Sequence, residues 1–130
     1  MIFGDDFEGG QGEWGVGSDG QAGTVWELGT PSVVGPASAA SPVNCFGTNL
    51  AANYGLDADV WLRSPAIDLT AAGAATLSYA QFRDIEQGFD FGMVRVLDAA
   101  DDSELAVIEA IIDDVSAGWE KVSKALPAEA

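Results

Sequence analysis

The chain has 130 residues, 48% of them hydrophobic, which is enough for one domain with a sizeable core. Its 21 Asp and Glu residues against five Lys and Arg give a net charge of −16, which would repel nucleic acids and anionic membranes. Because the chain has no His, Ser-His-Asp and Cys-His catalysis and all His-containing zinc sites are excluded within it. It also has no apolar run long enough for membrane insertion.

The first half of the chain predicts two strands and a long loop. Residues 2–8 alternate between apolar and acidic side chains, which predicts an opening strand with one core face and one carboxylate face. A second strand is predicted at residues 24–28 from its Val and Trp content. Residues 29–54 contain prolines and small polar residues with little periodicity, so we expect a long loop with a function or a ligand there.

The second half is a series of short strands. They are predicted at residues 60–63, 76–82, 93–97, 105–112 and 119–123. The Ala, Glu and Leu content of residues 105–112 would also suit a helix, but their β-branched side chains favour a strand. Asp101 and Asp102 predict a solvated hairpin turn. The pattern as a whole predicts an all-β fold.

Some side chains are predicted to lie in the core of this fold. The lone Cys45 cannot form an internal disulfide and is expected to be a small buried group. Four aromatic residues fall in the strand patterns and are also expected in the core: Trp26, Trp61, Tyr79 and Trp119.

Several segments, taken in order along residues 3 to 125, resemble one known type of domain. They are Asp6-Phe7-Glu8, Trp26-Glu27-Leu28-Gly29-Thr30-Pro31, Gly35-Pro36, Asn44-Cys45-Phe46-Gly47-Thr48-Asn49-Leu50, Asn53-Tyr54, Trp61-Leu62-Arg63-Ser64-Pro65-Ala66-Ile67-Asp68-Leu69, and Tyr79 through Gly92. The series resembles the MAM-like domains of bacterial surface proteins, the accessory domains of immune-inhibitor-type secreted metallopeptidases, and the cleaved-adhesin domains of gingipains.

This resemblance implies a fold, a location and an oligomeric expectation. It implies that residues 1–130 form a single antiparallel two-sheet β-sandwich of the concanavalin-like jelly-roll type, secreted or held at the cell surface. Members normally continue past a strand like residues 119–123 with further strands, and this chain ends at Ala130. An incomplete sandwich would leave open strand edges and an exposed core face, so we expect self-association into a homo-oligomer.

Acidic residues form the sharpest candidate site. Ca²⁺ takes six to eight oxygen ligands, and two carboxylates two residues apart on a strand face the same way. From spacing alone, solvated surface charge is the better interpretation of these acids. The family resemblance implies instead a structural calcium ion shared between the two acidic segments, with oxygen atoms near Asn49 completing its shell. The candidate ligands are Asp6, Glu8, Asp84, Glu86, Asp90 and Asn49.

The sequence contains candidates for two further kinds of site. The acids of residues 84–90 resemble the paired carboxylates of a glycoside hydrolase, but the second acid of that signature is missing at the expected spacing. Aromatic rings in predicted loops could stack on sugars or anchor a protein partner, although most loop aromatics pack back onto their own domain. The candidates for ligand binding are Trp14, Phe46, Tyr54 and Phe89.

The sequence therefore predicts a non-catalytic extracellular module for binding or adhesion, stabilised by calcium, that recognises a glycan or a protein. The alternative is a structural accessory domain of a secreted peptidase, and a glycoside hydrolase is the enzymatic alternative. No catalytic residue is assigned.

Overall fold

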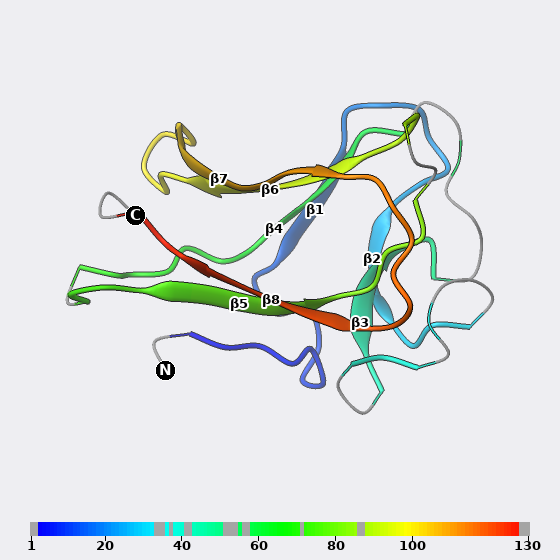
Figure 1. The fold of residues 1–130 in the computed structure, drawn as a ribbon, viewed down its shortest axis with the longest axis horizontal. Helices are drawn as coiled ribbons and strands as arrows, with labels where there is room; N and C mark the ends of the chain where they lie inside the picture. The colour runs from blue at the N-terminus through cyan, green and yellow to red at the C-terminus, as the bar shows by residue number, and fades with distance from the viewer. Residues whose placement is uncertain are drawn as a thin grey trace. The chain divides into compact units, whose positions relative to one another are not determined.

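The computed structural model describes residues 3–32, 36, 38–40, 43–50, 55, 58–70, 72–85 and 88–127. These residues form antiparallel strands and no helix, so the predicted all-β antiparallel fold class is confirmed (Figure 1). The part of the chain so described accordingly offers no helix that could cross a membrane. The chain divides into two compact units, Met1–Ile67 and Asp68–Ala130, each of which is described by itself. That residues 1–130 form one MAM-like domain stays a prediction.

The strands pair into small antiparallel sheets, called ribbons here because each has two strands. The strands are β1 (Gly15–Ser18), β2 (Trp26–Gly29), β3 (Cys45–Thr48), β4 (Val60–Arg63), β5 (Thr76–Gln81), β6 (Gly92–Leu97), β7 (Glu104–Ile112) and β8 (Glu120–Ala125). In the first unit β1 pairs with β4 and β2 with β3. In the second unit β5 pairs with β8 and β6 with β7.

The β1–β4 ribbon corrects one prediction about the core. Val60 and Leu62 are half-buried, whereas Trp61 between them is 41% exposed, so its predicted place in the core is wrong. Successive side chains of a strand point to opposite faces, and the two aliphatic residues occupy the inward face of β4. Trp61 lies instead against its cross-strand partner Gly17, where a Cβ atom would be 2.1 Å from Cζ2 of the indole ring.

The opening segment corrects a second prediction, because residues 3–8 contain no strand. The Oδ1 of Asp5 accepts a hydrogen bond from the backbone N–H of Phe7 at 2.7 Å, and that of Asp6 accepts one from Glu8 at 3.0 Å. Such Asp side chains hold the backbone in a turn, and Phe7 adopts a left-handed φ of 65°. Local hydrogen bonding therefore overrides the alternating pattern here.

The predicted long loop at residues 29–54 is wrong in part, because it contains β3. Cys45 at the start of this strand is 8% exposed, which confirms its predicted burial and raises the pKa of its thiol. Strand β1 was also missed. Its sequence, with glycines at positions 15 and 17, lacks the bulky residues that normally indicate a strand.

The second unit agrees closely with the sequence. Its four strands lie where they were predicted, and the hairpin between β6 and β7 turns at residues 98–103, as expected. The N–H of Asp102, whose φ is 61°, donates to the carbonyl of Asp98 at 2.8 Å. The Oδ1 of Asp101 accepts from the N–H of Ser103 at 3.0 Å, and this bond lowers the pKa of Asp101.

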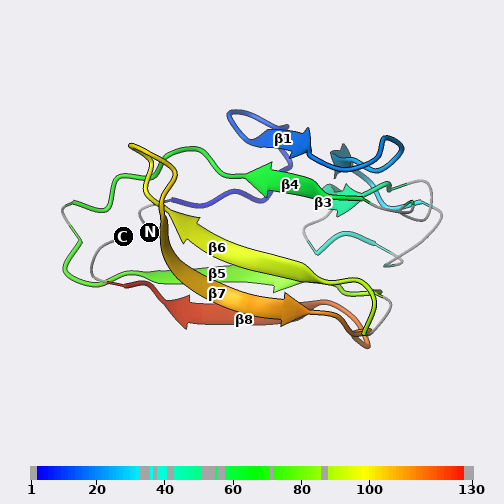
Figure 2. The same cartoon turned by 90° about the horizontal axis from the view of Figure 1, so that it is seen from above.

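The two ribbons of the second unit face each other, as Figure 1 shows, and Figure 2 gives the same strands from above. A hydrogen bond from the Tyr79 hydroxyl on β5 to Glu109 on β7 joins them. Ile112, at the end of β7, is 8% exposed and lies opposite Gly92 of β6. Two facing antiparallel layers with side chains between them are the arrangement of a β-sandwich.

Candidate functional site

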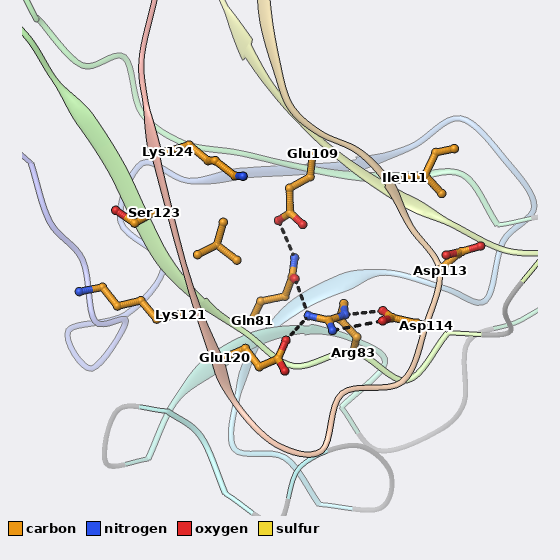
Figure 3. Close-up of a pocket in the computed structure, with 11 residues that line it drawn as sticks. Gln81, Arg83, Glu109, Ile111, Asp113, Asp114, Glu120, Lys121, Ser123 and Lys124 are labelled. Carbon is orange, nitrogen blue, oxygen red and sulfur yellow. Dashed lines mark hydrogen bonds and ion pairs between the residues drawn. The ribbon is translucent and has the colours of Figure 1, made fainter.

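The candidate site is a polar pocket in the second unit, beside strands β5, β7 and β8 (Figure 3). Its volume is about 520 Å³. The residues that line it are Gln81, Arg83, Glu109, Ile111, Asp113, Asp114, Glu120, Lys121, Val122, Ser123 and Lys124. Both signs of charge are therefore present on its walls, in a chain that is otherwise strongly acidic.

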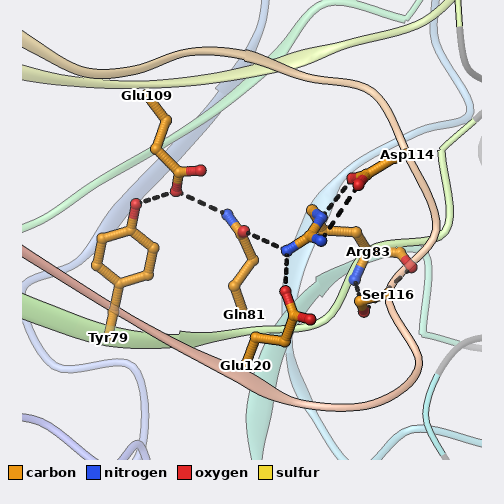
Figure 4. A network of polar contacts seen from close by, with 7 residues as sticks. All are labelled: Tyr79, Gln81, Arg83, Glu109, Asp114, Ser116 and Glu120. Carbon is orange, nitrogen blue, oxygen red and sulfur yellow. Dashed lines mark hydrogen bonds and ion pairs between the residues drawn. The ribbon is translucent and has the colours of Figure 1, made fainter.

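One wall of this pocket is a chain of hydrogen bonds that starts at Glu109 (Figure 4). Tyr79 and Gln81 are two residues apart on β5 and so point to the same face of the strand. The Tyr79 hydroxyl donates to the Glu109 carboxylate, and Nε2 of Gln81 donates to the same oxygen at 3.1 Å. Because Glu109 belongs to β7, these two bonds connect one ribbon to the other.

Arg83 extends the chain of contacts from the end of β5. Its Nη1 donates to Oε1 of Gln81 at 3.1 Å and to Oε1 of Glu120 at 2.7 Å. Its Nε and Nη2 donate to the two carboxylate oxygens of Asp114 at 2.5 and 3.3 Å. The Arg83 side chain is only 15% exposed, and the planar guanidinium binds oxygens of all three side chains at once.

The backbone around Arg83 is held as firmly as its side chain. Its N–H donates to Oγ of Ser116 at 2.9 Å, and the N–H of Ser116 donates back to the Arg83 carbonyl at 2.9 Å. Ser116 is 6% exposed. Next to this exchange, Asp84 forms a β-bridge with Val115. The segment that follows β5 is thereby tied to the segment between β7 and β8.

These contacts set the protonation states of the network. Burial, and then the hydrogen bond to Glu109, raise the pKa of Tyr79 well above its usual value, so the phenol stays protonated and acts as a donor. Hydrogen bonds to Asp114 and Glu120 raise the pKa of Arg83, and the guanidinium lowers the pKa of the Asp114 carboxyl. The arrangement can hold two β-layers in register, because its donors are engaged with acceptors inside the protein.

The predicted calcium ligands of the first unit bind backbone groups. The Oε2 of Glu8 accepts hydrogen bonds from the N–H groups of Asn44 at 2.7 Å and Val43 at 3.3 Å. Asn49 has a φ of 51°, and its side chain accepts from the N–H of Val25 at 3.0 Å and donates to the carbonyl of Gly23 at 2.8 Å. Both side chains connect segments that are distant in the sequence.

The remaining predicted ligands lie in the second unit. Asp84 is in the bridge to Val115, and Asp90 precedes β6, while Glu86 lies outside the described residues. In the described ranges, no group of three or more Asp, Glu, His or Cys side chains is placed to hold a metal ion. The described residues therefore do not by themselves form a calcium cage, and the shared calcium site stays a prediction.

The predicted ligand-binding aromatics have different surroundings. Trp14 and Phe46 are half-buried, and their ring centroids are 5.9 Å apart in a cluster completed by Phe3 and Phe7. The indole Nε1 of Trp14 also donates to Oδ2 of Asp5 at 2.9 Å. Phe89, in contrast, is 79% exposed. Tyr54 lies outside the described residues, and ligand binding by these four side chains stays a prediction.

The sequence did not single out the Arg83 network. Two signals point to it in retrospect. Arg83 is one of only five basic residues in the whole chain, so a functional or structural role for its charge is expected. It also follows Tyr79 and Gln81 at two-residue spacing, which places three polar groups on one side of a strand and its extension. Glu109, the acceptor of Tyr79 and Gln81, and Asp114, an acceptor of Arg83, cannot be identified without the fold.

The fold and the site together define the class of this protein as an all-β chain of small antiparallel sheets stabilised by side-chain networks. A curated protein to which the chain is similar is Bacillopeptidase F of Bacillus subtilis (strain 168), with 40% identity over 72 residues. The match covers 55% of this chain and 5% of that protein, so the chain corresponds to a small part of its relative. No family model matches the chain, and no solved structure matches it.

Proposed function

We propose that this chain is a non-catalytic, extracellular β-sandwich module that accompanies a peptidase and stabilises or positions it. The observation that carries the proposal is the 40% identity over 72 residues to a 5% portion of Bacillopeptidase F. A match that is confined to so small a portion of a long protein is expected of a module that is reused beside other domains. The MAM-like type of sandwich is part of the same proposal.

The chemistry of the chain supports an accessory role. No His is present in the sequence, so the chain cannot supply a Ser-His-Asp triad of its own. At and beside the polar pocket, Tyr79, Gln81 and Arg83 donate hydrogen bonds to carboxylates or amides of the same unit. A protonated Tyr79 and a paired Arg83 suit a structural network better than a nucleophile and its base.

The test is a chimera. In Bacillopeptidase F, the 72-residue segment that matches is replaced either by this chain or by a Gly/Ser linker of equal length, and secretion, caseinolytic activity and thermal inactivation are measured. We expect the chimera with this chain to match the parent protein and the linker version to be secreted poorly or inactivated faster. If the linker version equals the parent, the accessory role is refuted. The isolated chain should release nothing from casein or from β-glucans.

Adhesion is the second candidate function, because Phe89 exposes 79% of its surface to solvent and could contact a glycan or a protein. A glycan and protein array probed with wild type and with Phe89→Ser tests it, with and without Ca²⁺. Binding that survives the substitution would remove Phe89 from the ligand site. Calcium belongs to this proposal as a structural ion shared among the predicted acids, including Asp6 and Glu8.

A further inference from the structure

One face of the β6–β7 ribbon, the inner face, packs toward the β5–β8 ribbon. Glu109 of β7 is the register partner of Val94 on β6, so both side chains share one face of the ribbon. Glu109 receives hydrogen bonds from Tyr79 and Gln81 of β5, which places this face toward the β5–β8 ribbon. Residues that alternate with Val94 along β6 therefore point away from the β5–β8 ribbon.

Exposed apolar side chains lie on that outer face and in the segment that leads into β6, and we call them the outer strip: Phe89, Phe91, Met93 and Val107. Met93 precedes Val94 on β6, so it points to the outer face, and it is 49% exposed. Phe91 directly precedes β6 and is 69% exposed. Val107 is the register partner of Arg95, which also alternates with Val94, and is 44% exposed. Phe89, in the turn that leads to β6, is 79% exposed.

The area of this strip is comparable to the apolar area of one side of a protein interface. With roughly 150–200 Å² for each complete side chain, the exposed fractions correspond to about 450 Å² of apolar surface. A standard interface buries about 800 Å² per partner, somewhat more than half of it apolar, which is again about 450 Å². The strip alone therefore supplies the apolar surface that one side of a stable interface needs.

We propose that the outer strip is the interface of a homodimer, in which the outer faces of two β6–β7 ribbons pack on each other across a twofold axis. A twofold axis brings the same patch together twice, so no second complementary surface is required on the chain. The β5–β8 ribbon covers only the inner face of the β6–β7 ribbon. The second copy would cover its outer face.

Charge predicts how this dimer responds to salt. Arg95 and Glu104, half-exposed at the end of the strip, are 3.7 Å apart and form a neutral polar rim. Each chain nevertheless carries a net charge of −16, so two copies repel each other at low ionic strength. Added salt screens this repulsion and strengthens apolar contact, and the dimer should tighten as NaCl is raised.

Sedimentation equilibrium tests the proposal, with the chain at about 1–100 μM in about 20 and 500 mM NaCl, where the Debye length falls several-fold. We expect wild type to dimerise, more tightly at high salt. The Phe89→Ser/Phe91→Ser variant should weaken dimerisation by about 100-fold or more, since four buried aromatic rings are lost per dimer. Val25→Ser, which removes a 49% exposed side chain of the first unit, is the matched control and should dimerise like wild type.

Four other results would overturn the proposed dimer. Wild type that stays monomeric at the highest concentration and salt has no such interface. A double variant that still dimerises uses another surface, and a Val25→Ser variant that fails equally shows nonspecific association. A monomer that binds Bacillopeptidase F through the outer strip assigns the strip to that partner instead. Circular dichroism verifies that the variants fold. If the double variant does not fold, Met93→Glu, which adds a charge to the strip, replaces it in the test.

Discussion

Removal of one hydroxyl group tests whether the Tyr79 network holds the second unit together. The phenol of Tyr79 donates to the Glu109 carboxylate, and Tyr79→Phe deletes that bond without creating a large cavity. A hydrogen bond to a charged acceptor contributes about 1.5–3 kcal/mol. Tyr79 is only half-buried, and Gln81 still donates to Glu109 at 3.1 Å in the variant, so we expect a loss of about 1–2 kcal/mol. For a chain of this size that corresponds to a fall of about 3–8 °C in Tm.

Calorimetry and urea unfolding at neutral pH measure this loss. Ser78→Ala is the matched control, because Ser78 precedes Tyr79 on β5 and its hydroxyl meets that of Ser123 in an exposed pair at 3.1 Å. We expect the control to change stability by less than about 0.5 kcal/mol. A double-mutant cycle of Tyr79→Phe with Glu109→Gln should give a coupling energy of about 1 kcal/mol, because the two groups are in direct contact.

The same variant has a predicted pH signature. The pKa of Tyr79 is raised in the folded protein by burial and by Glu109, so the folded state favours the protonated phenol more than the unfolded state does. The stability from this preference is complete below the unfolded pKa of about 10 and is lost as pH rises from there toward the folded pKa. Wild type should therefore lose more stability than Tyr79→Phe above about pH 10. Equal stability at neutral pH together with equal alkaline profiles would refute the structural role of the network.

Two further predictions concern the first unit and calcium. Gly17→Ala should destabilise the protein by about 1–3 kcal/mol in urea unfolding, because its Cβ would meet the Trp61 ring at 2.1 Å, and a combined Trp61→Ala change should remove most of that effect. If Asp6, Glu8 and Asp84 share a structural ion, added Ca²⁺ should raise Tm relative to chelator, by the equivalent of about 2.7 kcal/mol at roughly a hundredfold excess over Kd. Glu8→Ala should abolish the part of that rise that NaCl of equal ionic strength does not reproduce, and equal melting in calcium, chelator and matched salt would contradict the site.

The local sequence pattern was sufficient to predict the strands of the second unit. Residues 60–63 at the end of the first unit and all four strands of the second were predicted within a few residues, because alternation and β-branched content are properties of each segment alone. The same holds for the hairpin turn at Asp101 and Asp102, whose bonds are local. The alternating pattern gives a wrong prediction where a side chain bonds to nearby backbone. At Phe7, the hydrogen bond from its N–H to Asp5 forms a turn in place of the predicted strand.

Tertiary structure alone decided which of these segments act together. Strand β1 is visible only once Trp61 is placed over Gly17, since glycine has no strand signal of its own. Tyr79, Gln81 and Arg83 are close in the sequence, but their acceptors are about 30 residues away. Tyr79 and Gln81 bond to Glu109 on β7, and Arg83 bonds to Asp114 just after β7. The sequence determined the charge of the chain and the strands of the second unit, because those depend on neighbouring residues. The contacts between layers depend on how distant strands pair and face each other, which no local pattern encodes.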